Sequence, residues 1–189
     1  AGAVGFATST APQHNGWGGQ PMPSRLADDT ELRALVKAMA SSGRGIFMLT
    51  KGNVTDVPYL ESIAAETGRP IMIAALLHNP TNPDGTFKDL RQIAAARTRG
   101  RELWGQVSCC PLTMDFTLQS PYPVEGFDAW QPLMKLGPDD LRRRLADRNF
   151  RQAVRDELAR PAGVRLFNGE WDKIEVTETA EPKNRHFEH

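Results

Sequence analysis

The stretch GRPIMIAALL, residues 68–77, decides the fold that this sequence predicts. It places a glycine and an arginine before an apolar run, and the same order recurs in GRGIFML, residues 43–49, and, with a Glu after the arginine, in GRELWGQVS, residues 100–108. Unbroken apolar runs are typical of parallel strands that helices cover on both faces. The sequence therefore predicts a repeated unit that ends in a buried parallel strand, with a first strand in GAVGFATS, residues 2–9.

A helix is predicted before each of the three glycines, because glycine closes a helix in the left-handed conformation at little cost. Asp28 or Asp29 caps the first helix, with Glu31 placed for a capping box. The second helix begins near Thr55 or Asp56, and the third begins near Thr86. The side chains expected to pack inward are Leu32, Leu35, Val36 and Met39 in the first helix, Leu60 and Ile63 in the second, and Phe87, Leu90, Ile93 and Ala94 in the third.

Strands that alternate with helices define an α/β fold class built from parallel βα repeats. We assign the repeats to residues 1–108, a long loop and helices to 109–160, and a strand with a C-terminal tail to 161–189. Within the last part, GVRLF at 163–167 and DKIEVTET at 172–179 are predicted strands. The alternation fits a (β/α) barrel or an open doubly wound sheet, and no domain boundary is evident.

The composition limits the partners and the cellular location that we expect for this chain. The chain has 189 residues, with 23 basic and 23 acidic side chains, so its net charge of zero favours no nucleic acid or acidic membrane as a partner. No apolar run approaches the roughly 20 residues of a membrane helix. Adjacent Cys109 and Cys110 are expected to be two reduced thiols, and no signal peptide is evident, so we expect a cytoplasmic protein. The chain does not begin with Met, and we expect it to be a segment of a longer protein.

Functional side chains are expected where loops leave the carboxyl ends of the strands, as in other parallel βα folds. Those loops are 8–24, 51–55, 78–85 and 109–126, and they hold His14, Lys51 and His78. We predict that these three residues bind substrate, with Lys51 pairing with a carboxylate. The alternative for all three is an ordinary role in a surface loop, with Lys51 a solvated lysine. No phosphate-binding loop, dinucleotide fingerprint or nucleophile elbow is present.

The stretch GAVGFATSTAPQHNGWGGQPMPSRLA, residues 2–27, resembles the D-aminoacylase (N-acyl-D-amino-acid deacylase) group of the amidohydrolase superfamily. The similarity continues through GRGIF, GRPIMIAALL, GQVSCCPLT, RNFRQAV and WDKIEV, and so covers essentially the whole chain. The resemblance implies a segment of a metal-dependent (β/α)8 TIM barrel of amidohydrolase type. It further implies a hydrolase that acts on non-peptide C–N bonds, with N-acyl-D-amino acids as substrates and zinc in the full-length parent.

The family pattern departs from this sequence at the metal ligands. Two metal histidines of the family fall at the ends of consecutive strands, where this chain has Thr50 and Ala75. No ligand is expected at those two positions, and His78 is the one candidate ligand nearby. The resemblance therefore identifies no catalytic residue here, and we expect the segment alone to be inactive and to contain no metal.

Two hypotheses follow. In the first, the parent is an amidohydrolase-like enzyme with a small N-acyl amino acid as substrate, and this chain is its central barrel segment. In the second, the chain is a non-catalytic α/β module that binds a small ligand or a partner and has lost the metal ligands. In either case a partial barrel leaves strand edges unpaired, and we expect the segment to self-associate.

Overall fold

The computed structural model describes residues 2–79, 82–160 and 165–188. The chain divides into two compact units, Ala1–Asp115 and Phe116–His189. The predicted βα repeats lie in the first unit, and the predicted loop and helices lie mainly in the second. Each unit is described below by itself.

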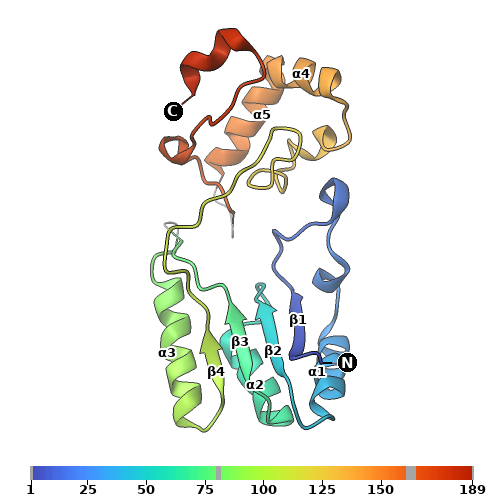
Figure 1. Ribbon diagram of the computed structural model, residues 1–189, viewed down its shortest axis with the longest axis vertical. Helices are drawn as coiled ribbons and strands as arrows, with labels where there is room; N and C mark the ends of the chain where they lie inside the picture. The colour runs from blue at the N-terminus through green and yellow to red at the C-terminus, as the bar shows by residue number, and fades with distance from the viewer. Residues whose placement is uncertain (1, 80–81, 161–164, 189) are drawn as a thin grey trace. The chain divides into compact units, whose positions relative to one another are not determined.

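The first unit contains a four-stranded sheet, which confirms the predicted α/β fold with parallel strands (Figure 1). Its strands are β1 (Gly5–Ser9), β2 (Ile46–Thr50), β3 (Ile71–Ala74) and β4 (Leu103–Gly105), and every neighbouring pair runs parallel. The strand order in space is the order in the chain, with no reversal. A doubly wound sheet requires a reversal of strand order, so these four strands are wound in one direction only.

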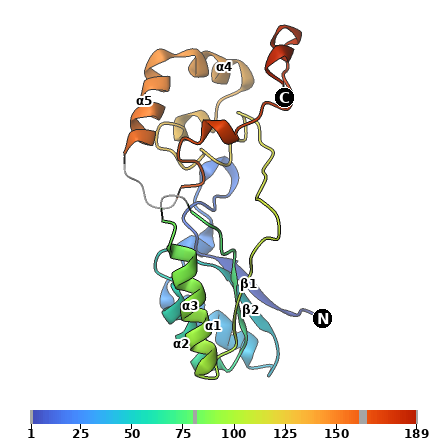
Figure 2. The ribbon, with the colours of Figure 1, turned by 90° about the vertical axis from the view of Figure 1, so that its left-hand side faces the viewer.

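Three helices alternate with the strands: α1 (Asp29–Ala40), α2 (Val57–Thr67) and α3 (Gly85–Thr98). They lie on the same face of the sheet (Figure 2), as right-handed crossovers between sequential strands require. The predicted caps are present, since the carboxylates of Asp28 and Asp56 accept the backbone N–H groups of Glu31 and Tyr59. Gly68 closes α2 in the left-handed conformation, as predicted.

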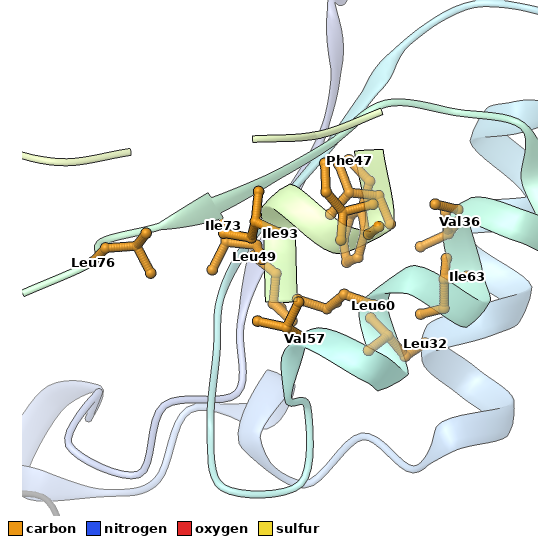
Figure 3. Packing of buried hydrophobic residues seen from close by; sticks show 14 residues of the cluster. Leu32, Val36, Phe47, Leu49, Val57, Leu60, Ile63, Ile73, Leu76 and Ile93 are labelled. Carbon is orange, nitrogen blue, oxygen red and sulfur yellow. The ribbon is translucent and has the colours of Figure 1, made fainter. Parts of the chain in front are cut away.

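The core of this unit lies between the sheet and the helices (Figure 3). Residues in register on neighbouring strands face the helices together, as Phe47 and Ile71 do in β2 and β3. They pack against the buried faces of α1, α2 and α3, and the helix residues of this cluster include Leu32, Val36, Leu60, Ile63 and Ile93. Burial of this apolar surface is the main force that holds the three βα units together.

The other face of the sheet is only partly covered. Ile46 on β2 is 43% exposed and Trp104 on β4 is 50% exposed, while Met48 and Met72 are half-buried. The prediction of burial on both faces is therefore wrong for the described residues of this unit. The physical reason is the sequential strand order, which places every crossover helix on one side.

Some helix residues that the sequence predicted to pack inward are exposed instead. Leu35 of α1 is 44% exposed, and in α3 Phe87, Leu90 and Ala94 are exposed, whereas Ile93 is buried as predicted. With 3.6 residues per turn, Phe87 lies about 120° around the helix from Ile93. Because Ile93 faces the sheet, Phe87 points away from it.

The second unit is built mainly from helices. The helices predicted within residues 109–160 are α4 (Pro138–Ala146) and α5 (Arg148–Ala159), which follows closely. A separate core forms here, in which the rings of Trp130 and Phe150 meet edge to face with their centroids 5.4 Å apart. None of the helices in the described ranges of the chain is both long and apolar enough to cross a membrane.

The two strands predicted near the C-terminus are not found. Residues 163 and 164 lie outside the described residues, and 165–167 form no strand. Of residues 172–179, only Val176 pairs, in an isolated bridge with Glu188. Val176 and Ile174 are exposed, so this apolar alternation has no sheet to pack on.

Candidate functional site at the carboxyl edge of the sheet

Because β1 to β4 are parallel, the loops that leave them begin at one edge of the sheet (Figure 1). This confirms the predicted arrangement of the loops. His14 lies in the loop after β1, Lys51 directly follows β2, and His78 lies in the loop after β3. The edge therefore holds all three of the predicted binding residues, and the contacts of each residue decide what it can do there.

The loops after β1 and β2 are tied together by two threonines. The hydroxyl oxygens of Thr10 and Thr55 are 2.6 Å apart, and the backbone N–H of Gly52 donates to both at 2.8 Å. A Cβ atom on Gly52 would lie 2.2 Å from the carbonyl oxygen of Thr10. This position therefore requires glycine, and the close approach fixes one loop against the other.

Ser9 holds the ring of His14. Ser9 is the last residue of β1 and is buried, and its Oγ lies 2.6 Å from Nδ1 of His14. The backbone N–H of Ala11 donates to the same Oγ at 3.2 Å. The serine hydroxyl therefore joins the end of the strand to the loop histidine and fixes the plane of the imidazole.

Arg25 lies against the backbone of the same loop. Its Nη1 donates to the carbonyl oxygen of His14 at 3.2 Å and to Oδ1 of Asn15. Burial lowers the pKa of His14 below its ordinary value of 6.5, and the positive charge of Arg25 lowers that pKa further. At neutral pH the site therefore presents a neutral imidazole beside a guanidinium.

Lys51 has a protein partner. Its Nζ lies 2.9 Å from a carboxylate oxygen of Asp89, on α3, and both side chains are largely buried. The predicted role of Lys51 was to pair with a substrate carboxylate. In this structure Lys51 already pairs with Asp89, so its positive charge is less available to a substrate carboxylate than the sequence predicted.

His78 is exposed in the loop that follows β3. The contacts described above join His14 to Ser9 and Lys51 to Asp89, and they do not join the three predicted binding residues to one another. The structure brings these residues to one edge but does not assemble them into one cluster.

The residues at this edge do not fit a zinc site. Thr50 is the last residue of β2 and Ala75 follows β3 directly, so they occupy strand ends, where the resemblance places metal histidines. Zinc sites use histidine, cysteine and carboxylate ligands. Across residues 2–79, 82–160 and 165–188, no group of three such side chains could hold a metal. Cys109 and Cys110 are free thiols, as predicted, and both are exposed.

Ser9 and Arg25 are site residues that the sequence reasoning missed. A signal for Arg25 was available, because it is the only basic residue of the chain before Arg33 and no acidic residue precedes Asp28. No sequence rule pairs Ser9 with His14, since that contact depends on how the loop turns back to the strand end.

A comparison with protein-family models, curated proteins and solved structures finds no match to this chain. Fold and site together define an α/β protein with a four-stranded parallel sheet and a polar cluster at its carboxyl edge.

Proposed function

We propose that this chain is a segment of an amidohydrolase-type (β/α)8 barrel. The complete protein would hydrolyse C–N bonds other than peptide bonds, with N-acyl-D-amino acids as substrates. In this proposal the chain supplies barrel strands and the substrate-binding loops. It supplies no metal ligand from its described residues, and we expect no activity from the chain alone.

The observation that best supports the proposal is the order of the parallel strands in the sheet. Four parallel strands in chain order, with the intervening helices α1, α2 and α3 on one face, are the repeating geometry of a (β/α) barrel wall. In such barrels the substrate binds at the carboxyl ends of the strands. Ser9, His14 and Arg25 gather at that edge. The adjacent free thiols favour a reducing cytoplasmic location for the protein.

The chain's own residues support substrate binding, and no proton transfer is assigned to them. A neutral imidazole fixed by Ser9 is a directional hydrogen-bonding group, and a guanidinium is suited to a carboxylate. His14 would contact the substrate, and His78 would lie at the periphery of the same edge.

The experiment is an assay of the complete protein. We would purify it, measure bound zinc by elemental analysis, and follow release of free amine from a panel of N-acetyl-D-amino acids. The proposal expects turnover that a chelator abolishes, with the segment alone inactive. Absence of both metal and turnover across the panel would reject it.

A non-catalytic binding module is the second candidate function. The observation in its favour is that Thr50 and Ala75 provide no metal ligand at the strand ends. His14→Ala and His78→Ala variants of the complete protein separate the two candidates. A binding module loses ligand binding with no activity to lose, whereas an enzyme loses catalytic efficiency.

A further inference from the structure

Arg25 is a cation without an acidic partner among the described residues. Both of its hydrogen bonds come from Nη1, and both acceptors are neutral oxygens, on His14 and Asn15. The side chain is half-buried rather than extended into solvent. A guanidinium has five N–H donors in a planar fork, so most of its donor capacity remains unused by the contacts described.

Several other cations of this unit are paired with carboxylates, whereas Arg69 and Arg97 donate to backbone carbonyl oxygens. Lys51 pairs with Asp89, Arg33 with Asp29 and Glu66, and Arg99 with Glu61. Arg25 differs because its loop, residues 8–27, contains no carboxylate at all. A half-buried positive charge that lacks a counter-charge attracts an anion from solution, and the guanidinium fork matches a carboxylate with two parallel hydrogen bonds.

The surroundings of Arg25 are polar and have hydrogen-bonding capacity to spare. In the same loop, Oε1 of Gln13 and Oγ of Ser24 are buried and have no hydrogen-bond partner among the residues that the structure describes. Buried polar atoms without partners are uncommon, and an absent ligand or water is one physical reason for them.

We propose that Arg25 is the anion-binding residue of the carboxyl edge and takes the carboxylate of the N-acyl amino acid, in place of Lys51. The inference rests on the proposed function for the identity of the substrate class. It assigns the α-carboxylate to the loop after β1, beside the His14 ring, rather than to the loop after β2.

The test compares a carboxylate with its uncharged isostere. N-acetyl-D-leucine and N-acetyl-D-leucinamide are titrated into the 189-residue chain by calorimetry at low ionic strength, where a charge pair is least screened. We expect the carboxylate to bind and the carboxamide to bind at least about tenfold more weakly, a difference of about 1.4 kcal/mol.

Variants then locate the site. Arg25→Gln should weaken carboxylate binding at least about tenfold and remove the preference over the carboxamide, and Arg25→Lys should lie between, since it keeps the charge but loses the fork. Arg44→Gln removes the same charge at the opposite edge and should leave the affinity unchanged. Circular dichroism and urea midpoints establish that each variant is folded.

Three outcomes would overturn the inference. They are equal affinity for carboxylate and carboxamide, no carboxylate binding by the folded chain, and loss of binding in Lys51→Gln/Asp89→Asn but not in Arg25→Gln. The last outcome would show that Lys51, in the loop after β2, binds the carboxylate, and it would leave the proposed function unaffected. That function fails separately, in the metal and turnover assay of the complete protein.

Discussion

The hydroxyl of Ser9 lies 2.6 Å from Nδ1 of His14, and this contact joins the end of β1 to the loop that follows it. The two residues are five positions apart in the chain, and the loop turns back so that the ring meets the strand end. Arg25 also contacts this loop, since it donates to the carbonyl oxygen of His14. One strand end thus positions both an imidazole and a guanidinium at the proposed binding edge.

The first prediction concerns the pKa of His14. Burial and the charge of Arg25 hold this pKa below 6.5, so Arg25→Gln should raise it, while burial keeps it below 6.5. The pKa is measured by NMR titration of the imidazole proton, assigned with a His14→Gln variant. A His14 pKa at or above 6.5 in the unmodified protein, or one that falls in Arg25→Gln, would contradict the arrangement.

The same shift predicts how stability depends on pH. The folded state binds a proton at His14 less readily than the unfolded state, whose pKa is 6.5. The contribution of His14 to the free energy of unfolding is therefore complete above pH 6.5 and is lost as the pH falls from 6.5 through the lower folded pKa. His14→Gln should reduce the pH dependence of stability in that interval.

The second prediction concerns Gly52. Gly52→Ala should lower the free energy of unfolding of the first unit by about 1–3 kcal/mol, because the new methyl group meets the backbone oxygen of Thr10. Urea denaturation measures the change. Gly16→Ala is the matched control, since its Cβ would make only an ordinary contact at 3.7 Å. Equal stability of the two variants would show that the loops after β1 and β2 do not approach as closely as described.

The sequence predicted the sheet better than the site. The recurring Gly-Arg pairs before apolar runs located β2, β3 and β4, and the caps Asp28 and Asp56 located two helix starts. These signals are local, since a cap or a closing glycine depends on a few neighbouring residues. The sequence did not decide between a sheet wound in one direction and a doubly wound sheet. That difference depends on which strands pair, and pairing is not a local property.

The contacts of the site could not be predicted for the same reason. Lys51 follows its strand as expected, but its partner Asp89 lies 38 positions along the chain on α3. Arg25 was not predicted as a site residue, and only the folded loop places it on the backbone of His14. Side-chain pairing across elements is set by tertiary packing, which spacing does not encode.

The third prediction tests the orientation of α3. Ile93→Ala should destabilise the first unit by about 2–5 kcal/mol, because a buried side chain leaves a cavity. Phe87→Ala should cost less than about 1 kcal/mol, since Phe87 is 55% exposed despite its larger ring. Urea denaturation of both variants provides the comparison. A larger loss of stability in Phe87→Ala than in Ile93→Ala would show that Phe87 packs inward, as the sequence predicted.

The fourth prediction is that the chain associates with itself at micromolar concentration. In the sheet described here β1 and β4 are edge strands, and the face opposite the helices exposes Ile46 and Trp104. Sedimentation velocity should detect dimers or larger species, and Ile46→Lys should shift the population toward monomer. Leu26→Lys, at another exposed apolar position, serves as the control. A compact monomer at all accessible concentrations would contradict this prediction.

The most direct test of the central claim is NMR chemical-shift mapping of the 189-residue chain during titration with N-acetyl-D-leucine. The account predicts perturbed backbone amides in the segments that follow the strands, residues 10–28, 51–56 and 75–79, with the largest changes around His14 and Arg25. Perturbations confined to the opposite edge, at the turns of Gly43, Gly68 and Gly100, or to the second unit would show that the carboxyl edge is not the binding site.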